Sequence, residues 1–133
     1  MTSGRRHVFS GSVYEEMAGY ARAVIVDDRI FVSGTVGVDV ATGEMPDGAA
    51  AQAGCAMDTI EKALTDAGSC IADIVRIRVF VPDPEDVMAV SMVLKDRAGF
   101  TAPANTTVCA PLAVAGARVE IEVEAIRGSG VRH

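Results

Sequence analysis

The stretch that decides the fold is residues 101–126, TAPANTTVCAPLAVAGARVEIEVEAI. It predicts two strands joined by a loop rich in Ala, Gly and Pro. In its second half, apolar and charged residues alternate without a break, and successive side chains of a strand point to opposite faces. One predicted face holds Val119, Ile121, Val123 and Ala125, and the other holds Arg118, Glu120, Glu122 and Glu124.

Three carboxylates in a row on one strand face are unusual, because like charges repel unless neighbouring groups compensate them. One interpretation is a solvated sheet face on which arginines of adjacent strands pair with the carboxylates. The other interpretation is that one of the three carboxylates serves a cleft.

The chain length of 133 residues predicts a single domain over residues 1–133, with flexible tails at 1–10 and 128–133. Half of the residues are hydrophobic, which is enough to form a core. The net charge is −6 and no basic stripe is present, which argues against nucleic acid as a partner.

Three cysteines, Cys55, Cys70 and Cys109, lack metal-like or redox spacing, which predicts reduced thiols in a cytoplasmic protein. Cys109 is expected to be a small buried residue. No signal peptide and no stretch long enough to cross a bilayer is evident, so no membrane partner is expected.

The order of predicted elements is strands, helix, strand, helix, strands. A hairpin is expected over residues 20–33 after an irregular arm with at most one short strand, and Gly34 predicts a bulge or a close backbone approach. A helix over 47–68 would start at Asp47 and end at Gly68, with Gly54 marking a close contact. Residues 74–81 form the strongest strand, and Asp83 followed by proline opens a second helix that Gly99 closes.

This order predicts an α+β fold: one sheet of about six strands with two helices on one face. No third helix remains to cover the other face of the sheet. A homo-oligomer is the simplest way to cover it.

Several chemistries are excluded by residue placement. Both histidines, His7 and His133, are expected in the tails, so neither a histidine triad nor a zinc site is expected in the body. Lys62 and Lys95 are predicted to be exposed on helices, which disfavours a Schiff-base lysine. Proton transfer by glutamate, or binding alone, remains.

A set of short motifs then resembles a known family in both order and spacing. The chain is similar to the Rid family, also called YjgF or RidA-like and historically the endoribonuclease L-PSP family, over about residues 11–126. The residues that carry this resemblance are Tyr20, FVSG at 31–34, the turn at 39–44, Gln52, Ala67-Gly68, 73–75, Pro103-Ala104 and VEIE at 119–122.

The resemblance implies a chorismate-mutase-like fold and a homotrimer, in which the sheets form a central barrel and small molecules bind in clefts between subunits. It implies hydrolysis of reactive enamines and imines to keto acids and ammonia, with no cofactor and no metal. The carboxylate that positions water would be Glu120, or Glu122 after a two-residue slip of the alignment. Tyr20, Ser33 and Gly34 match the family's substrate-binding positions.

The chain departs from the family pattern at the site. Active deaminases carry an Arg after Pro-Ala that clamps the substrate carboxylate, and here that position is Asn105. Two further substrate-binding positions are Ser91 and Thr107, where relatives often carry Asn and Cys. Exchanging a bidentate Arg for Asn weakens carboxylate binding by about 10-fold. Arg22 or Arg118 is a candidate to compensate, although each has an ordinary ion pair as its alternative role.

The sequence therefore predicts a Rid-like homotrimer that binds a small metabolite between subunits and hydrolyses C=N compounds. The alternative is a non-catalytic small-molecule-binding or chaperone-like module. An endoribonuclease is a third possibility, against which the acidic net charge and the lack of body histidines count.

Overall fold

The computed structural model describes residues 4–130 as a two-layer structure. A six-stranded mixed sheet has the strand order β1-β2-β3-β6-β4-β5, and all neighbours are antiparallel except β4 and β5. The strands are β1 (Arg5–Val8), β2 (Ala23–Val26), β3 (Arg29–Val36), β4 (Ile74–Val81), β5 (Ala104–Cys109) and β6 (Glu120–Ile126).

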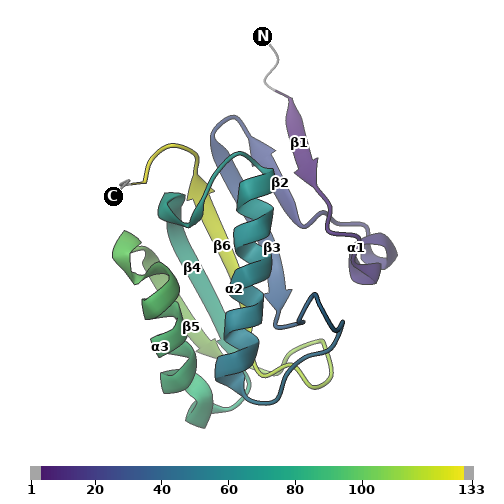
Figure 1. The fold of residues 1–133 in the computed structure, drawn as a ribbon, viewed down its shortest axis with the longest axis vertical. Helices are drawn as coiled ribbons and strands as arrows, with labels where there is room; N and C mark the ends of the chain where they lie inside the picture. The colour runs from purple at the N-terminus through teal and green to yellow at the C-terminus, as the bar shows by residue number, and fades with distance from the viewer. Residues whose placement is uncertain (1–3, 131–133) are drawn as a thin grey trace.

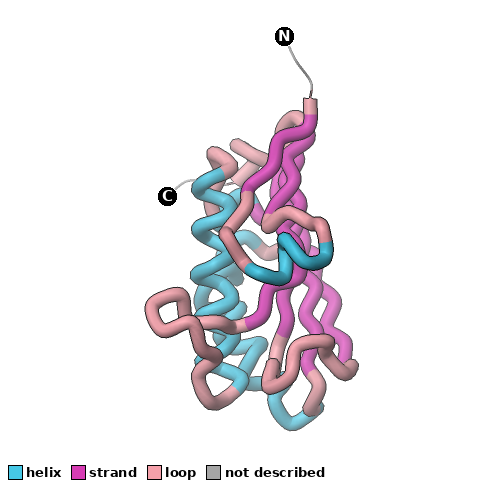
Figure 2. Tube along the Cα trace, turned by 90° about the vertical axis from the view of Figure 1, so that its right-hand side faces the viewer, coloured by secondary structure: helices cyan, strands magenta, loops and turns pink. Residues whose placement is uncertain are grey.

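Two long helices, α2 (Ala49–Asp66) and α3 (Val87–Ala98), cover one face of this sheet (Figures 1 and 2). A short helix α1 (Val13–Ala18) lies beside the β1–β2 edge (Figure 1). Three 3-10 turns, η1 (Ile71–Asp73), η2 (Pro84–Asp86) and η3 (Gly99–Thr101), flank β4 and α3. The predicted α+β fold is confirmed.

The strand β6 lies between β3 and β4 at the centre of the sheet. Its alternation is as predicted, because Ile121, Val123 and Ala125 are buried under the helices while the glutamates lie on the far face. The helices contribute Met57, Ile60, Leu64, Val90 and Leu94 to the same core. The side of each residue of β6 is therefore fixed by this core.

Local signals explain most of the helix boundaries. The Asp83 side chain accepts a hydrogen bond of 2.9 Å from the Glu85 N–H, and Pro84 follows it, as the sequence predicted. Gly68 adopts a positive φ of 82° just after α2, which confirms its role at the helix end. The predicted N-cap Asp47 is wrong: α2 begins after Gly48, which has no side chain to cap it.

Glycines in and after β3 let the backbone bend and approach its neighbours. The register of β3 against β6 shifts between Val32 and Thr35, so the bulge predicted at Gly34 is confirmed. At Gly37, a Cβ atom would overlap the backbone of Gln52 and lie 2.5 Å from its Cα. The end of β3 therefore packs directly on the start of α2. The close contact predicted at Gly54 is wrong, because a Cβ there meets nothing within 4 Å.

The N-terminal region is more ordered than the sequence suggested. Residues 5–8 pair with β2 instead of forming a flexible tail, and α1 was not predicted. His7 accordingly lies in β1, stacked on Phe9 at 5.9 Å between ring centroids. His133 lies outside the described residues. At the other end, the Gly130 N–H donates to Asp73.

The strands β5 and β6 do not pair with each other, because β4 lies between them. As an edge strand, β5 is exposed along its whole length in the protomer. Cys109 is therefore exposed, contrary to the prediction that it is buried. All three cysteines are free thiols.

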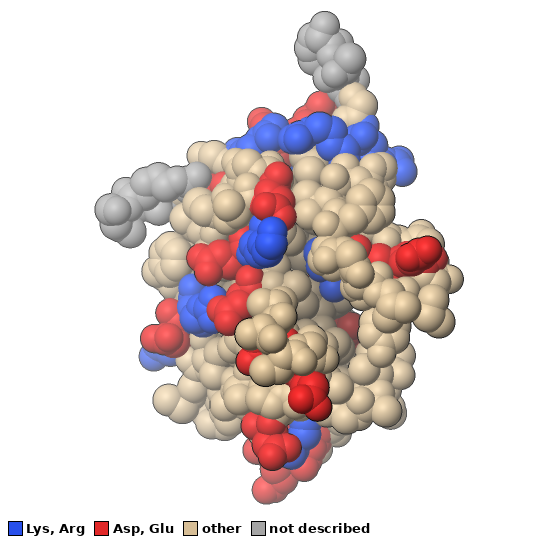
Figure 3. Space-filling view, turned by 45° about the vertical axis from the view of Figure 1, so that its right-hand side comes forward, with Lys and Arg blue, Asp and Glu red and all other residues tan. Residues whose placement is uncertain are grey.

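Charges are mixed over the helical layer. Acidic and basic side chains intersperse there, and Lys and Arg gather in a band near the N-terminal end (Figure 3). None of the helices within residues 4–130 has the length and apolar character needed to span a membrane.

The close packing of Gly37 on α2 can be tested by its effect on stability. Gly37→Ala should lower the free energy of unfolding by about 3 kcal/mol, because backbone atoms that cannot rotate away must shift. Gly54→Ala is the matched control, and it should raise stability by up to about 1 kcal/mol because alanine favours helix and the added Cβ meets open space. Urea denaturation at equal protein concentration measures both, and equal stability of the two variants would refute this account of the packing.

Candidate functional site

The far face of the sheet carries the row of carboxylates on β6 opposite arginines of β4. Arg78 lies 3.8 Å from Glu122 and 3.4 Å from Glu124, and Arg76 lies 3.9 Å from Glu124. These pairs match the interpretation of a sheet face with cross-strand arginine partners. They account for two of the three carboxylates.

Glu120 differs from the other two glutamates of β6. Its cross-strand neighbours are Phe80 on β4 and Val36 on β3, so no arginine stands opposite it. Its carboxylate instead lies against Gly34, where a Cβ would come within 2.8 Å of Oε2. Among the ion pairs within residues 4–130, none involves Glu120. Geometry thus separates Glu120 from Glu122.

Burial of the carboxylate raises the pKa of Glu120 above its ordinary value. The positive charge of Arg22 opposes this shift, and the negative charge of Glu122 adds to it. A half-buried carboxylate of raised pKa is typical of a general base, because its basicity lies closer to neutral pH.

Three predicted residues, Tyr20, Ser33 and Gly34, lie at the open end of the β2–β3 hairpin, and Gly34 is the one that contacts Glu120. Tyr20 is partly exposed, and its ring lies 5.6 Å from the guanidinium carbon of Arg22. The Ser33 hydroxyl donates to the Ala21 carbonyl at 2.7 Å, which ties the hairpin to the segment that carries Tyr20. We call Tyr20, Arg22, Ser33, Gly34 and Glu120 the Glu120 cluster.

Arg22 is buried within this cluster. Its Nη2 donates to the Gly34 carbonyl at 3.1 Å, and its Nε lies 3.7 Å from the Glu15 carboxylate. Glu15 is itself buried and accepts hydrogen bonds from the backbone N–H and the hydroxyl of Ser10. Nothing in the sequence marks Glu15 as a site-related residue, since it stands in a polar arm with no periodic pattern.

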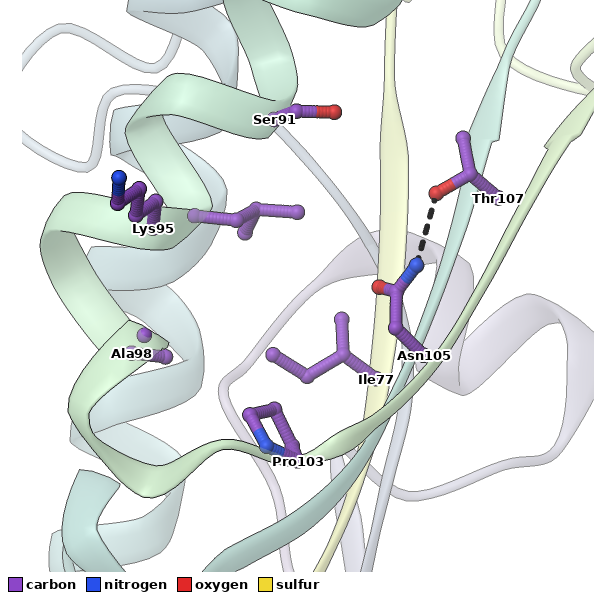
Figure 4. A pocket seen from close by; sticks show the side chains of 9 residues that line it. Ile77, Ser91, Lys95, Ala98, Pro103, Asn105 and Thr107 are labelled. Atoms are coloured by element: carbon purple, nitrogen blue, oxygen red, sulfur yellow. Dashed lines mark hydrogen bonds between the residues drawn. The ribbon is translucent and has the colours of Figure 1, made fainter.

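The remaining predicted residues line a second place, which we call the β5 pocket. Ser91 of α3 and Asn105 and Thr107 of β5 face a shallow space of about 220 Å³ (Figure 4). The Asn105 amide donates to the Thr107 hydroxyl at 3.2 Å. The other walls are largely apolar and come from Ile77, Leu94, Lys95, Ala98, Gly99 and Pro103. The amino group of Lys95 points away from Asn105 (Figure 4), so no cation is fixed inside this pocket.

The Glu120 cluster and the β5 pocket do not meet within one protomer. Glu120 on β6 is two strand spacings from β5, about 10 Å, and Gly34 on β3 is three spacings away, about 14 Å. Moreover, Glu120 lies on the far face, whereas Asn105 and Thr107 face α3. One small molecule therefore cannot contact both groups in a single chain.

Arg118, the second candidate to replace the family's substrate-binding arginine, is already paired with Asp86. Its Nη2 lies 2.6 Å from the Asp86 carboxylate, and its Nε donates to the same oxygen at 3.0 Å. Its backbone N–H donates to the side chain of Gln52 at 2.7 Å. Gln52 also donates to two backbone carbonyls, so it anchors the loop that leads into Glu120. Arg22 is thus the arginine nearest to the site chemistry.

Within residues 4–130, no group of three or more metal-ligating side chains lies together. The arrangement supplies a carboxylate, hydroxyls, an amide and a buried guanidinium. Such groups can orient a polar ligand and move a proton.

Comparison with known proteins finds relatives over nearly the whole chain. Residues 12–127 match the model of the endoribonuclease L-PSP family. A Rattus norvegicus protein named 2-iminobutanoate/2-iminopropanoate deaminase is 32% identical over 130 residues, covering 96% of this chain and 95% of the relative. The Bos taurus protein of the same name is 34% identical over 110 residues, covering 82% of this chain and 80% of the relative.

Solved structures show the same fold. A member of the YjgF/YER057c/UK114 family from Mycobacterium tuberculosis superposes with a TM-score of 0.84 at 35% identity, covering 92% of this chain and 99% of that chain. The YjgF gene product of E. coli superposes with a TM-score of 0.82 at 27% identity, covering 92% and 98%. This chain belongs to the endoribonuclease L-PSP family, which is also called the Rid or YjgF family.

Proposed function

We propose that this protein hydrolyses the C=N bond of small 2-imino acids to a keto acid and ammonia, with Glu120 as the base. The observation that carries the proposal is the Glu120 carboxylate, half-buried against Gly34 without an ion pair and with a raised pKa. The names of the rat and bovine relatives support the substrate class.

In the proposed reaction, the Glu120 carboxylate takes a proton from water as the water oxygen bonds to the imine carbon. The electron pair of the C=N bond moves to nitrogen, which takes that proton from Glu120 and completes a carbinolamine. Glu120 then accepts the proton of the carbinolamine hydroxyl and delivers it to the nitrogen as the C=O bond forms and the C–N bond breaks. Ammonia leaves, and the Glu120 carboxylate is regenerated.

We further propose that the working site lies between two copies in a homotrimer. The separation of the Glu120 cluster from the β5 pocket supports this proposal, because one ligand could contact both groups only where two copies meet. The far face of the sheet also leaves Phe31 more than one-third exposed, and no helix of residues 4–130 covers it. In such a cleft, Tyr20 and the Ser33–Gly34 backbone of one copy would meet Ser91, Asn105 and Thr107 of another.

The β5 pocket favours one alternative, a binding module without turnover. Asn105 and Thr107 present neutral groups, so a substrate carboxylate would be held by hydrogen bonds alone. Saturable ligand binding without ammonia release would establish this alternative. Cleavage of RNA by purified protein, lost in Glu120→Gln, would instead support an endoribonuclease.

Glu120→Gln should abolish ammonia release from freshly generated 2-iminopropanoate, because an amide cannot accept the proton from water. A loss of at least about 100-fold is expected for a general base. Glu122→Gln is the matched control on the same strand face, and it should retain most activity because its carboxylate pairs with Arg78. Unchanged turnover in Glu120→Gln, with the same elution volume as the wild type, would remove Glu120 from the mechanism.

The raised pKa of Glu120 also sets the pH dependence. The base acts only as the carboxylate, so activity should fall as pH drops through the pKa of Glu120. Because burial raises that pKa, the acid limb of kcat/KM should lie above the ordinary glutamate value of about 4.3. The rate is measured after subtraction of spontaneous hydrolysis at each pH. A rate that stays constant down to the ordinary glutamate value would contradict a role as base.

Asn105→Arg tests the β5 pocket as the place where the substrate carboxylate binds. A guanidinium there should lower KM for 2-iminopropanoate by about 10-fold, because a charged bidentate hydrogen bond replaces a neutral one. Asn105→Gln, which adds length but no charge, is the control and should show no such gain. Equal KM values for the arginine and glutamine variants would place the carboxylate elsewhere.

A further inference from the structure

Arg22 is a buried cation that has no role in the reaction steps proposed above. Arg22 is 7% exposed, and its Nε is buried without a hydrogen bond. Three groups surround the guanidinium: the Glu15 carboxylate of α1, the Tyr20 ring and the Gly34 carbonyl. A desolvated cation with only part of its hydrogen-bond donors satisfied lowers the stability of the fold, so its location calls for a physical reason.

The contacts of Arg22 converge on the bulge of β3. Its Nη2 donates to the Gly34 carbonyl, and the Glu120 carboxylate lies against the Cα of the same residue. Arg22 and Glu120 therefore hold one glycine between them. A shift of the bulge would therefore change where the Glu120 carboxylate can lie.

Arg22 also acts on Glu120 through its charge. The groups near Glu120 on β3 are Gly34 and Val36, which do not titrate, and the residue opposite on β4 is Phe80. The remaining charges are Glu122 on the same strand, already paired with Arg78 of β4, and Arg22, which is paired with Glu15 of α1. Of these charges, the guanidinium of Arg22 is the one that favours the ionised form of Glu120.

We propose that Arg22, braced by Glu15 and Tyr20, is the positioning residue that holds the Gly34 bulge against Glu120 and keeps Glu120 ionised for proton transfer. The inference rests on the proposed function only in taking Glu120 as the base. Arg22 itself touches no reacting atom.

The experiment uses the full chain and two independent readouts. The first is the pH dependence of ammonia release from 2-iminopropanoate. The second is titration of the Glu120 carboxylate by carbon NMR, with its signal identified by its loss in Glu120→Gln. Because Arg22→Gln leaves Glu15 buried without its partner, the double variant Glu15→Gln/Arg22→Gln is included, in which both charges of the buried pair are removed.

In both variants that lack the Arg22 charge, the titration midpoint of the Glu120 carboxylate should rise. The acid limb of kcat should shift to higher pH by the same amount. At neutral pH, kcat should fall by on the order of 10-fold, with KM changed less. Arg22→Lys keeps the charge and should restore the titration toward that of the wild type. The matched control is Arg29→Gln, which removes an arginine that also lies 5.6 Å from an aromatic ring, that of Phe31, and it should change neither readout.

Titration of Glu120 at the wild-type pH in the folded double variant would overturn the proposal, whatever happens to the rate. A fall in kcat without movement of the acid limb would also overturn it, since that result indicates a structural role alone. If the wild type releases no ammonia, the proposed reaction fails instead, and the NMR titration still decides whether Arg22 controls Glu120.

Discussion

The alternation of side chains along β6 is the constraint on which both the fold and the site depend. Hydrogen bonding to β3 and β4 on its two sides leaves this strand no freedom to rotate. Ile121 and its flanking residue Val119 are fully buried under the helices, so Glu120 between them must point to the far face. A slip of one residue would bury three carboxylates in the core, and the register is therefore strongly specified. The same packing that stabilises the protein also directs the Glu120 carboxylate to the far face.

The chemistry of each carboxylate on β6 is then decided by its cross-strand neighbour. Glu122 stands opposite Arg78 and Glu124 opposite Arg76, and each arginine offers a counter-charge. Glu120 stands opposite Phe80, which offers no charge. Desolvation without an opposing ion pair raises the pKa of a carboxyl group, as it does for Glu120. One strand with a simple repeat thus holds two structural carboxylates and one that is suited to proton transfer.

Most of the helices and strands could be predicted from the sequence, but the way they bring the candidate site residues together could not. The period-two pattern of β6, Asp83 followed by proline, and the glycines at 34 and 68 act locally, so they predicted the strand, the helix start, the bulge and the helix end. The resemblance to the Rid family supplied the candidate site residues. In contrast, the pairing of β1 with β2 and the burial of Glu15 arise from long-range contacts that leave no periodic signal. The placement of the predicted site residues on two faces depends on Asn105 pairing with Ile77 of β4, a register that no local pattern encodes.

The docking of α1 shows how fold and chemistry are coupled through one ion pair. The only buried residue of this helix is Glu15, while its larger apolar side chains Val13 and Met17 are exposed. Hydrophobic burial therefore contributes little to its position, and the contacts of Glu15 with Ser10 and Arg22 hold it instead. A salt bridge of this kind repays its desolvation only when its geometry is well satisfied, and the Nε of Arg22 is not. Well-packed apolar residues of similar volume often stabilise a fold at least as well as a buried ion pair. What apolar residues could not provide is a positive charge beside Gly34 and Glu120, so the ion pair is better explained by its effect on the site than by its contribution to stability.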